Sequence, residues 1–359
     1  MGLVLLAVAI VTLVFFVFLM LLGPSQRFRN TWIGHLHQFF TEDFIDILQD
    51  GIKRLLGRRL YGLLKKIFTY VAFEANPLVQ VLYLALLTVG VYVFFKDGWT
   101  KIPGPYASET HRYFIPPVVF ITYLSFALVS FSNPGVVNES NVRRACEMFS
   151  YDYINFKPKT CTTCCLQKPA RSKHCSMCKA CIARSDHHCI WVNNCVGLNN
   201  HRYFIAFLSS TAITCIYASV MIAKILYGEI ARQDLLNSWY WDPDTRQRVQ
   251  VTLFKALSMV INTNVNLGAL GIFCALCSII VTVFFLAHLY TLSDGTTTNE
   301  SFKWEDVKEA VEDGRLYMKS QTSQDSEMAQ ILHFDQVSNI YDQGRWKNIW
   351  RFIVPEQTL

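Results

Sequence analysis

Charged residues are scarce in this chain: they make up 17% of its 359 residues, against roughly a quarter in an ordinary soluble domain. Hydrophobic residues account for 52%, and the mean hydropathy is +0.25. This balance excludes an intrinsically disordered chain, and it argues against a single soluble domain because so few charges could not cover its surface. The composition therefore indicates an integral membrane protein.

Internal repeats, low-complexity tracts and a recognisable signal peptide are also lacking. The apolar run at residues 2–22 has no basic residue before it and no A-x-A-like cleavage site, and it is longer than the 7–15 residues of a signal core. We therefore expect a retained span. The lack of repeats argues against an inverted-repeat transporter. Transporters also tend to place paired charges inside their spans, whereas these spans contain only His288 and, near a span end, Lys224.

Long apolar runs set the architecture, because a helix that crosses hydrocarbon needs about 20 mainly apolar residues. Five segments meet this requirement: 2–22, 77–95, 114–131, 203–227 and 267–292. The expected fold is an all-α polytopic membrane protein of about five transmembrane helices with one small domain rich in cysteine.

Lysine and arginine are unevenly divided among the segments between these spans. Segments 23–76, 132–202 and 293–359 contain 25 of the 33 basic residues. The positive-inside rule places such segments in the cytosol, so the N-terminus is expected in the lumen and the C-terminus in the cytosol. The net charge of +6 thus reflects membrane orientation, and no nucleic-acid partner is expected.

Residues 23–76 form the first of these cytosolic segments and include an amphipathic stretch. Apolar residues recur every three or four positions from Phe44 to Phe68, with six basic residues among them. A basic helix lying in the lipid headgroup layer has this pattern. A helix packed against the cysteine-rich segment is the alternative interpretation.

Cysteine is concentrated in one place, since eight of the twelve cysteines lie between Cys161 and Cys195. Thiols stay reduced in the cytosol, which argues against disulfides. Repeated C-x2-C spacing followed by further Cys and His is the pattern of tetrahedral zinc sites. With three histidines, His174, His187 and His188, the run from Cys161 to Cys195 offers eleven candidate ligands.

Two tetrahedral zinc ions need eight ligands and leave three over. A surplus His and a surplus Cys fall within Asp186-His187-His188-Cys189. A carboxylate, an imidazole and a thiol so close together form the group that a cysteine nucleophile requires. Spacing alone does not decide which histidine binds zinc.

The run from Cys161 to Phe204 resembles the DHHC family of protein S-acyltransferases (palmitoyltransferases). Two outlying motifs are similar to those of the family: Thr297-Thr298-Asn299-Glu300 to its TTxE motif and Asn339-Ile340-Tyr341-Asp342-Gln343-Gly344 to its tail motif. Asn133-Pro134-Gly135 stands where the family usually has Asp-Pro-Gly, which keeps the turn-forming Pro-Gly. The layout looks closest to the fungal endoplasmic-reticulum branch.

The resemblance implies specific roles for residues of this chain. It implies one structural zinc on Cys161, Cys164, His174 and Cys181, and a second on Cys175, Cys178, His188 and Cys195. Cys189 would be the nucleophile, His187 its base and Asp186 the partner that orients the base. Thr297 would hydrogen-bond Asp186, Asn339 and Tyr341 would dock the tail, and Arg171 would bind phosphates of coenzyme A.

The function implied is palmitate transfer from palmitoyl-CoA to cysteines of membrane-associated proteins, in two steps through acyl-Cys189. Expected partners are long-chain acyl-CoA, the lipid bilayer and membrane-anchored substrates with juxtamembrane cysteines, SNAREs among them. The expected location is the endoplasmic-reticulum membrane. The alternative is a catalytically silent zinc-finger membrane scaffold.

Overall fold

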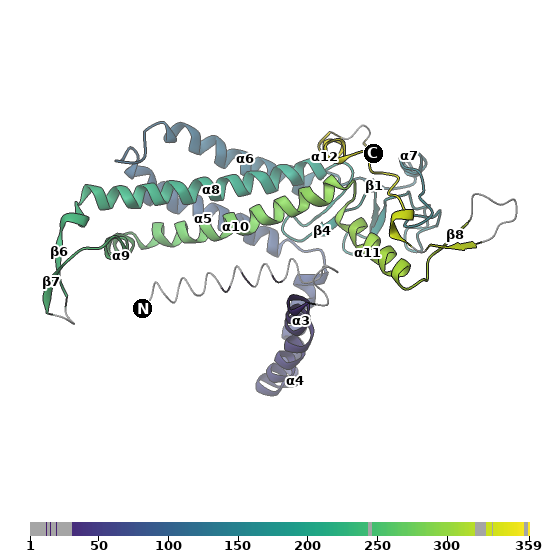
Figure 1. Ribbon diagram of the computed structural model, residues 1–359, viewed down its shortest axis with the longest axis horizontal. Coiled ribbons are helices and arrows are strands. Elements are labelled where there is room, and N and C mark those ends of the chain that lie inside the picture. Colours follow the sequence, from purple (N-terminus) through teal and green to yellow (C-terminus); the bar gives the residue numbers. More distant parts are fainter. Residues whose placement is uncertain are drawn as a thin grey trace. The chain divides into compact units, whose positions relative to one another are not determined.

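The structure is a computed structural model (Figure 1). It describes residues 12, 15, 19, 31–242, 246–319, 328–331, 333–354 and 358–359. The first expected span, 2–22, lies outside the described residues except for Thr12, Phe15 and Leu19.

Helices dominate the described part of the chain, with short strands between them. The α-helices are α3 (Trp32–Gln38), α4 (Phe44–Phe73), α5 (Leu78–Val93), α6 (His111–Phe131), α7 (Val142–Glu147), α8 (His201–Arg232), α9 (Leu253–Thr263), α10 (Val265–Ser293), α11 (Thr298–Glu312) and α12 (Arg345–Ile353). Short 3-10 or π turns are η1 (Phe39–Asp43), η2 (Phe94–Gly98), η3 (Trp99–Lys101), η4 (Leu235–Asn237) and η5 (Phe334–Gln336). The strands are β1 (Val136–Val137), β2 (Lys173–Cys175), β3 (Ala180–Ile182), β4 (His187–Cys189), β5 (Asn194–Val196), β6 (Trp239–Asp242), β7 (Gln247–Gln250), β8 (Tyr317–Lys319) and β9 (Met328–Gln330).

The chain forms two compact units. The first comprises Met1–Val79, Leu128–Ile205 and Leu286–Leu359, and it contains the cysteine-rich segment. The second comprises Gln80–Ala127 and Ala206–Phe285 and consists mainly of apolar helix.

Four helices among the described residues are long and apolar enough to cross a membrane: Leu78–Lys101, His111–Phe131, His201–Arg232 and Val265–Ser293. Each overlaps one of the expected spans 77–95, 114–131, 203–227 and 267–292. The helices continue beyond the apolar runs, because a helix that leaves hydrocarbon can keep its backbone hydrogen bonds through polar residues. The expectation of a mainly helical membrane protein is confirmed.

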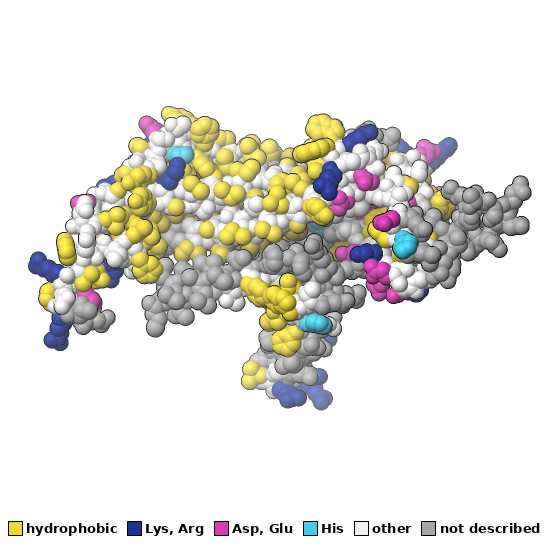
Figure 2. Space-filling view, viewed as in Figure 1, with side chains coloured by type: hydrophobic (Ala, Val, Ile, Leu, Met, Phe, Trp, Pro, Cys, Tyr) yellow, Lys and Arg dark blue, Asp and Glu magenta, His cyan; other side chains and the backbone are white. Residues whose placement is uncertain are grey.

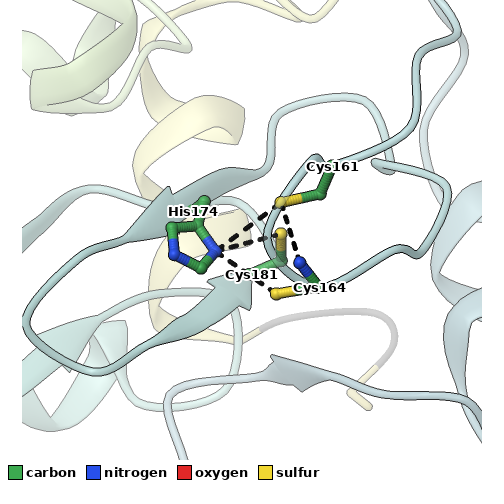
Figure 3. A group of neighbouring side chains, drawn as sticks. All are labelled: Cys161, Cys164, His174 and Cys181. Carbon is green, nitrogen blue, oxygen red and sulfur yellow. Dashed lines mark hydrogen bonds between the residues drawn. The ribbon is translucent and has the colours of Figure 1, made fainter.

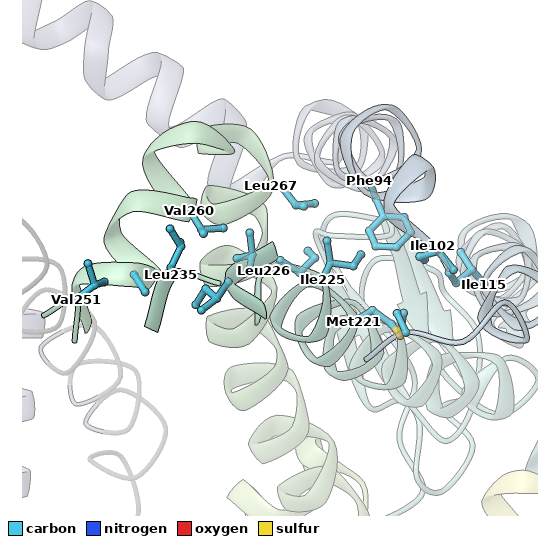
Figure 4. Close-up of a cluster of buried hydrophobic side chains, with 14 residues drawn as sticks. Phe94, Ile102, Ile115, Met221, Ile225, Leu226, Leu235, Val251, Val260 and Leu267 are labelled. Atoms are coloured by element: carbon cyan, nitrogen blue, oxygen red, sulfur yellow. The ribbon is translucent and has the colours of Figure 1, made fainter. Parts of the chain in front are cut away.

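Side chains from several helices form the core of the second unit (Figure 4). Met221 and Ile225 of α8 and Leu267 of α10 are at most 3% exposed. On the outside of this unit, large apolar side chains such as Val89 and Phe120 are about 60% exposed. Figure 2 shows hydrophobic atoms over these helices and basic side chains gathered at the β6–β7 hairpin. An apolar exterior is what a lipid-facing helix requires.

Hydroxyl groups connect the helices within the second unit. The Oγ atoms of Ser125 in α6 and Ser210 in α8 are 2.7 Å apart. The Oγ1 atoms of Thr122 and Thr214, on the same two helices, are also 2.7 Å apart. Such bonds are available to transmembrane helices because small polar side chains permit close approach.

The described residues form four small sheets. In the first unit, β3 lies between β1 and β2, β4 pairs with β5, and β8 pairs with β9. His174 lies opposite Cys181 in the first of these sheets, and His188 lies opposite Cys195 in the second. In the second unit, β6 pairs with β7. The registers in the first unit therefore bring potential metal ligands together in pairs.

Helix α4 covers the expected amphipathic stretch, with a break in helical geometry at Gly57, where φ is +73°. Leu55, Leu63 and Phe68 along it are 84%, 54% and 65% exposed. Apolar side chains left uncovered in this way favour the headgroup-layer interpretation over packing against the cysteine-rich segment.

We predict that Gly271→Ala destabilises the second unit. A methyl group at Gly271 would lie 2.7 Å from Cγ2 of Ile222, whose side chain is 1% exposed. Overpacking of this kind costs about 1–3 kcal/mol, which should lower the thermal midpoint of the detergent-solubilised protein. Gly62→Ala is the matched control because its methyl group meets open space. Equal midpoints for the two variants would contradict the prediction.

Candidate zinc centres and active site

Four side chains converge at the first cluster, which consists of Cys161, Cys164, His174 and Cys181 (Figure 3). The Nδ1 atom of His174 lies 3.6 Å from Sγ of Cys161, 3.2 Å from Sγ of Cys164 and 3.9 Å from Sγ of Cys181. The backbone amide of Cys164 donates to Sγ of Cys161 at 3.5 Å, which closes the C-x2-C turn.

The second cluster repeats this arrangement with Cys175, Cys178, His188 and Cys195. The Nδ1 atom of His188 lies 3.7, 3.3 and 3.6 Å from the three sulfurs, in that order. The sulfurs of Cys178 and Cys195 are 3.5 Å apart.

These spacings fit zinc. Tetrahedral zinc with Zn–S of about 2.3 Å and Zn–N of about 2.0 Å places S and N about 3.5 Å apart and two sulfurs about 3.8 Å apart. Each cluster supplies three sulfurs and one nitrogen, a complete tetrahedral set. Two Cys/His clusters that could each bind zinc are therefore present, and both match the sets that the family resemblance implies.

Strand β2 contributes to both clusters through adjacent residues, His174 to the first and Cys175 to the second. Successive side chains of a strand point to opposite faces, so one short strand can serve two metal ions. The ligand sets consequently interleave along the sequence.

Cys189 belongs to neither cluster. It ends strand β4 and is 8% exposed. It lies near His187, and its thiol is one of the groups that raise the pKa of that imidazole. On the other side of the ring, Nδ1 of His187 lies 2.5 Å from Oδ2 of Asp186. The three side chains therefore form a continuous carboxylate–imidazole–thiol chain.

Burial and hydrogen bonding shift the pKa values of the carboxylate and the imidazole in this group of side chains. Burial would raise the pKa of Asp186, but the hydrogen bond and charge of His187 outweigh burial and hold that pKa well below its usual range. Burial would lower the pKa of His187, yet the hydrogen bonds to Asp186 and Cys189 raise it to about 10. An imidazole so strongly basic favours removal of the proton from a neighbouring thiol.

The start of helix α11 holds Asp186 from a distant part of the sequence. The backbone amide of Thr298 donates to Oδ1 of Asp186 at 2.7 Å. The sequence predicted that the hydroxyl of Thr297 would make this contact, and that detail is wrong. The hydroxyl of Thr297 donates to the carbonyl of Ser185 at 3.0 Å, since Thr297 caps the helix and its neighbour's amide points at the carboxylate.

Thr297 and Glu300 form a reciprocal capping box at this helix start. Glu300 also binds the guanidinium of Arg171, with Nε to Oε1 at 2.7 Å and Nη2 to Oε2 at 2.5 Å. The same guanidinium donates to the carbonyl of Gly295 at 2.8 Å. Helix α11 is thereby fastened to the cysteine-rich segment.

The predicted role of Arg171 in binding coenzyme A phosphates does not agree with this geometry. Its side chain is 5% exposed and its guanidinium is paired with a carboxylate. The positive charge of Arg171 is therefore neutralised by Glu300 within the protein. Sequence gave no local sign of this pairing, because the two partners are 129 residues apart.

The tail motif lies against the same arginine. The ring of Tyr341 stacks under the guanidinium of Arg171 at 4.6 Å, and its hydroxyl donates to the carbonyl of Ser150 at 2.6 Å. The side chain of Asn339 donates to the carbonyl of Asp294 at 3.1 Å and accepts from the amide of Tyr341 at 3.0 Å. Both residues thus join the tail to the rest of the first unit.

Other polar residues near the site had no structural role assigned from sequence. Asn194 donates to the carbonyl of Ser132 at 2.8 Å and fixes the β4–β5 hairpin to the end of α6. The Nε2 atoms of His201 and His288 are 3.0 Å apart, and both imidazoles lie near Asp186. His288 was noted only as a histidine in a span.

Comparison with known proteins agrees with this geometry. Residues 154–305 match the family described as DHHC palmitoyltransferase. The chain is 32% identical to palmitoyltransferase swf1 of Schizosaccharomyces pombe, covering 96% of this chain and 94% of the relative. It is 27% identical to palmitoyltransferase SWF1 of Saccharomyces cerevisiae (85% and 76% covered) and 29% identical to palmitoyltransferase ZDHHC4 of Rattus norvegicus (66% and 65% covered).

The chain belongs to the DHHC palmitoyltransferase family and is a protein S-acyltransferase. The resemblance noted in the sequence is therefore confirmed.

Metal content provides a direct test of the ligand sets. We expect two zinc ions per chain in the purified protein, and two in Cys189→Ser, because Cys189 lies outside both clusters. Cys161→Ser and Cys195→Ser should each lose at least one zinc ion. Inductively coupled plasma mass spectrometry measures these ratios, and loss of zinc from Cys189→Ser would make Cys189 a ligand.

The pairing of Arg171 with Glu300 predicts a large loss of stability in Glu300→Gln. Removing one partner of a buried ion pair leaves an uncompensated charge and costs about 3–5 kcal/mol. Glu312→Gln is the control: its carboxylate is 3.9 Å from Lys308 and 64% exposed, so its removal should cost less than about 1 kcal/mol. Thermal unfolding of both variants measures the difference. Similar midpoints would show that the buried pair contributes little.

Proposed function

We propose that this enzyme transfers palmitate from palmitoyl-CoA to cysteine thiols of membrane-anchored proteins through an acyl-Cys189 intermediate. The observation that carries the proposal is that Cys189 lies outside both metal clusters and beside His187. Asp186, bonded to His187, orients the base.

In the first step, His187 takes the proton of Cys189. The resulting thiolate attacks the carbonyl carbon of the acyl-CoA thioester, and the bond from that carbon to the coenzyme A sulfur breaks. The proton on His187 passes to the departing sulfur. One thioester replaces another of similar energy, so the exchange needs neither ATP nor a catalytic metal.

In the second step, His187 takes the proton of a substrate cysteine. That thiolate attacks the carbonyl of acyl-Cys189, and the Cys189 sulfur leaves and regains a proton. The ionised Asp186 stabilises the imidazolium in both steps, since the hydrogen bond of 2.5 Å joins it directly to His187.

Zinc, when bound, supplies folding energy to the cysteine-rich segment. Each cluster offers four protein ligands, which leaves no position for a reacting water. The role proposed for Cys161, Cys164, His174 and Cys181, and for Cys175, Cys178, His188 and Cys195, is therefore structural.

Apolar helices suit an acyl donor and substrates that remain in the bilayer. A palmitoyl chain exposed to water would cost about 0.8 kcal/mol per methylene. We assign the substrates to membrane-anchored proteins with juxtamembrane cysteines, including SNAREs.

The distribution of basic residues supports cytosolic placement of 23–76, 132–202 and 293–359 and a lumenal N-terminus. The proposed location is the endoplasmic-reticulum membrane.

Self-acylation tests the intermediate. The purified full-length protein, incubated with labelled palmitoyl-CoA, should acquire a hydroxylamine-sensitive label that is absent from Cys189→Ser. Cys165→Ser is the matched control because Cys165 is an exposed thiol beside the first cluster; it should label fully. Asp186→Asn should label at least tenfold more slowly, because the base loses its ionised partner.

A label that persists in Cys189→Ser would assign the intermediate to another thiol. Zinc content measured on the same samples separates loss of chemistry from loss of folding. A catalytically silent scaffold would acquire no label even as the wild-type protein with both zinc ions present.

A further inference from the structure

A cavity of about 70 Å³ lies in the first unit between the cysteine-rich segment and helix α12. Its lining includes Arg171, Arg184 and Arg351, and none of the described residues that line it carries a carboxylate. A water molecule needs about 10–15 Å³ on this scale, so the cavity has room for about five waters. An oxyanion of about five heavy atoms has a similar size.

Arg184 is the unusual member of this lining. Its side chain is buried, with the residue 4% exposed. Nη1 donates to the carbonyl of Arg351 at 3.2 Å, and Nη2 to the carbonyl of Leu198 at 3.4 Å. Nε is buried and has no hydrogen-bond partner in the part of the chain that the structure describes. The guanidinium also lies over the ring of Phe352 at 4.4 Å.

The positive charge of Arg184 has no carboxylate beside it among the described residues. Glu300 pairs with Arg171, and Asp186 pairs with His187. Among the described residues, no carboxylate lies within ion-pair distance of Arg184; Glu300 and Asp186 act on it only at longer range. Burial and the nearby Arg171 lower the pKa of Arg184 to about 9. A buried cation without a counter-charge destabilises the fold, and a bound anion would offset that destabilisation.

We propose that this cavity is a phosphate-binding site whose main cation is Arg184. A tetrahedral oxyanion can accept from Nε and the Nη atoms of one guanidinium together, which is the geometry in which arginine recognises phosphate. Its negative charge would compensate the buried guanidinium. The site is separate from the carboxylate–imidazole–thiol chain, and its occupation does not depend on acyl transfer.

Helix α12 indicates the source of the phosphate. Asn348 and Phe352 lie on its buried face, whereas Trp346 and Trp350 are 86% and 61% exposed. Arg345 and Lys347 of the same helix are also exposed. A short helix with exposed tryptophans and basic residues is typical of the lipid headgroup layer. We therefore assign the phosphate to a phosphomonoester lipid headgroup.

Thermal unfolding of the full-length protein in a phosphate-free detergent tests this assignment. Three probes carry the same chemistry: dioctanoyl phosphatidylinositol 4-phosphate, inorganic phosphate and coenzyme A. We expect the lipid to raise the midpoint saturably. Arg184→Met should weaken that effect at least tenfold, and without any probe it should unfold at the same or a higher temperature, because it removes an unpaired buried charge.

Lys347→Met is the matched control, since it removes an exposed charge from α12 and should change the apparent affinity less than threefold. If inorganic phosphate or coenzyme A stabilises the protein through Arg184 and the lipid does not, the cavity binds phosphate but the assignment to a lipid headgroup is wrong. Stabilisation by none of the probes, or equally in Arg184→Met, would overturn the site. If Arg184→Met does not fold, Arg184→Gln, which also removes the charge, tests the site with the same expected loss. A Cys189→Ser background makes each result independent of catalysis.

Discussion

Tetrahedral coordination by sulfur and imidazole nitrogen is the constraint on which the first unit depends. The segment between Cys161 and Cys195 has short strands and few large apolar side chains, so it could not form an adequate core by itself. Two four-ligand clusters fix its turns and strand registers instead. The position of Cys189 follows, because the residue before it is a ligand and the strand opposite carries another.

The nucleophile is placed by metal ligands, but the base is placed by helix α11. Asp186 receives the amide of Thr298, and the helix that begins there is held by Glu300 on Arg171. Tyr341 in turn stacks on Arg171. A single buried guanidinium therefore joins the cysteine-rich segment, the end of α10 and the tail. Changes far from the thiol in sequence can reach the catalytic chain through this one side chain.

The features that sequence predicted are those with a local signature. Apolar runs of about 20 residues identified the four described candidate spans, and C-x2-C spacing with nearby histidines identified the metal-binding segment. Family resemblance, and not spacing, divided the ligands between two clusters. The pairing of Arg171 with Glu300 and the unpaired burial of Arg184 have no local pattern, because each depends on segments that meet only in the folded chain. Thr297 was misjudged for the same reason: its motif implied proximity to Asp186, but the cap geometry directs its hydroxyl to Ser185 and the next amide to the carboxylate.

Adjacent residues of strand β2, His174 and Cys175, serve different metal ions. When one ion binds, it fixes the strand whose opposite face presents a ligand to the other ion. In a chain that carries one zinc ion, most of the ligands for the second ion are therefore already ordered, so the second ion binds with a smaller loss of conformational entropy. Zinc binding should therefore be cooperative. Newly made chains would contain either no zinc or two zinc ions, and few chains would contain one. The supply of zinc in the cell would then set how many enzyme molecules are competent, while each competent molecule keeps the same activity.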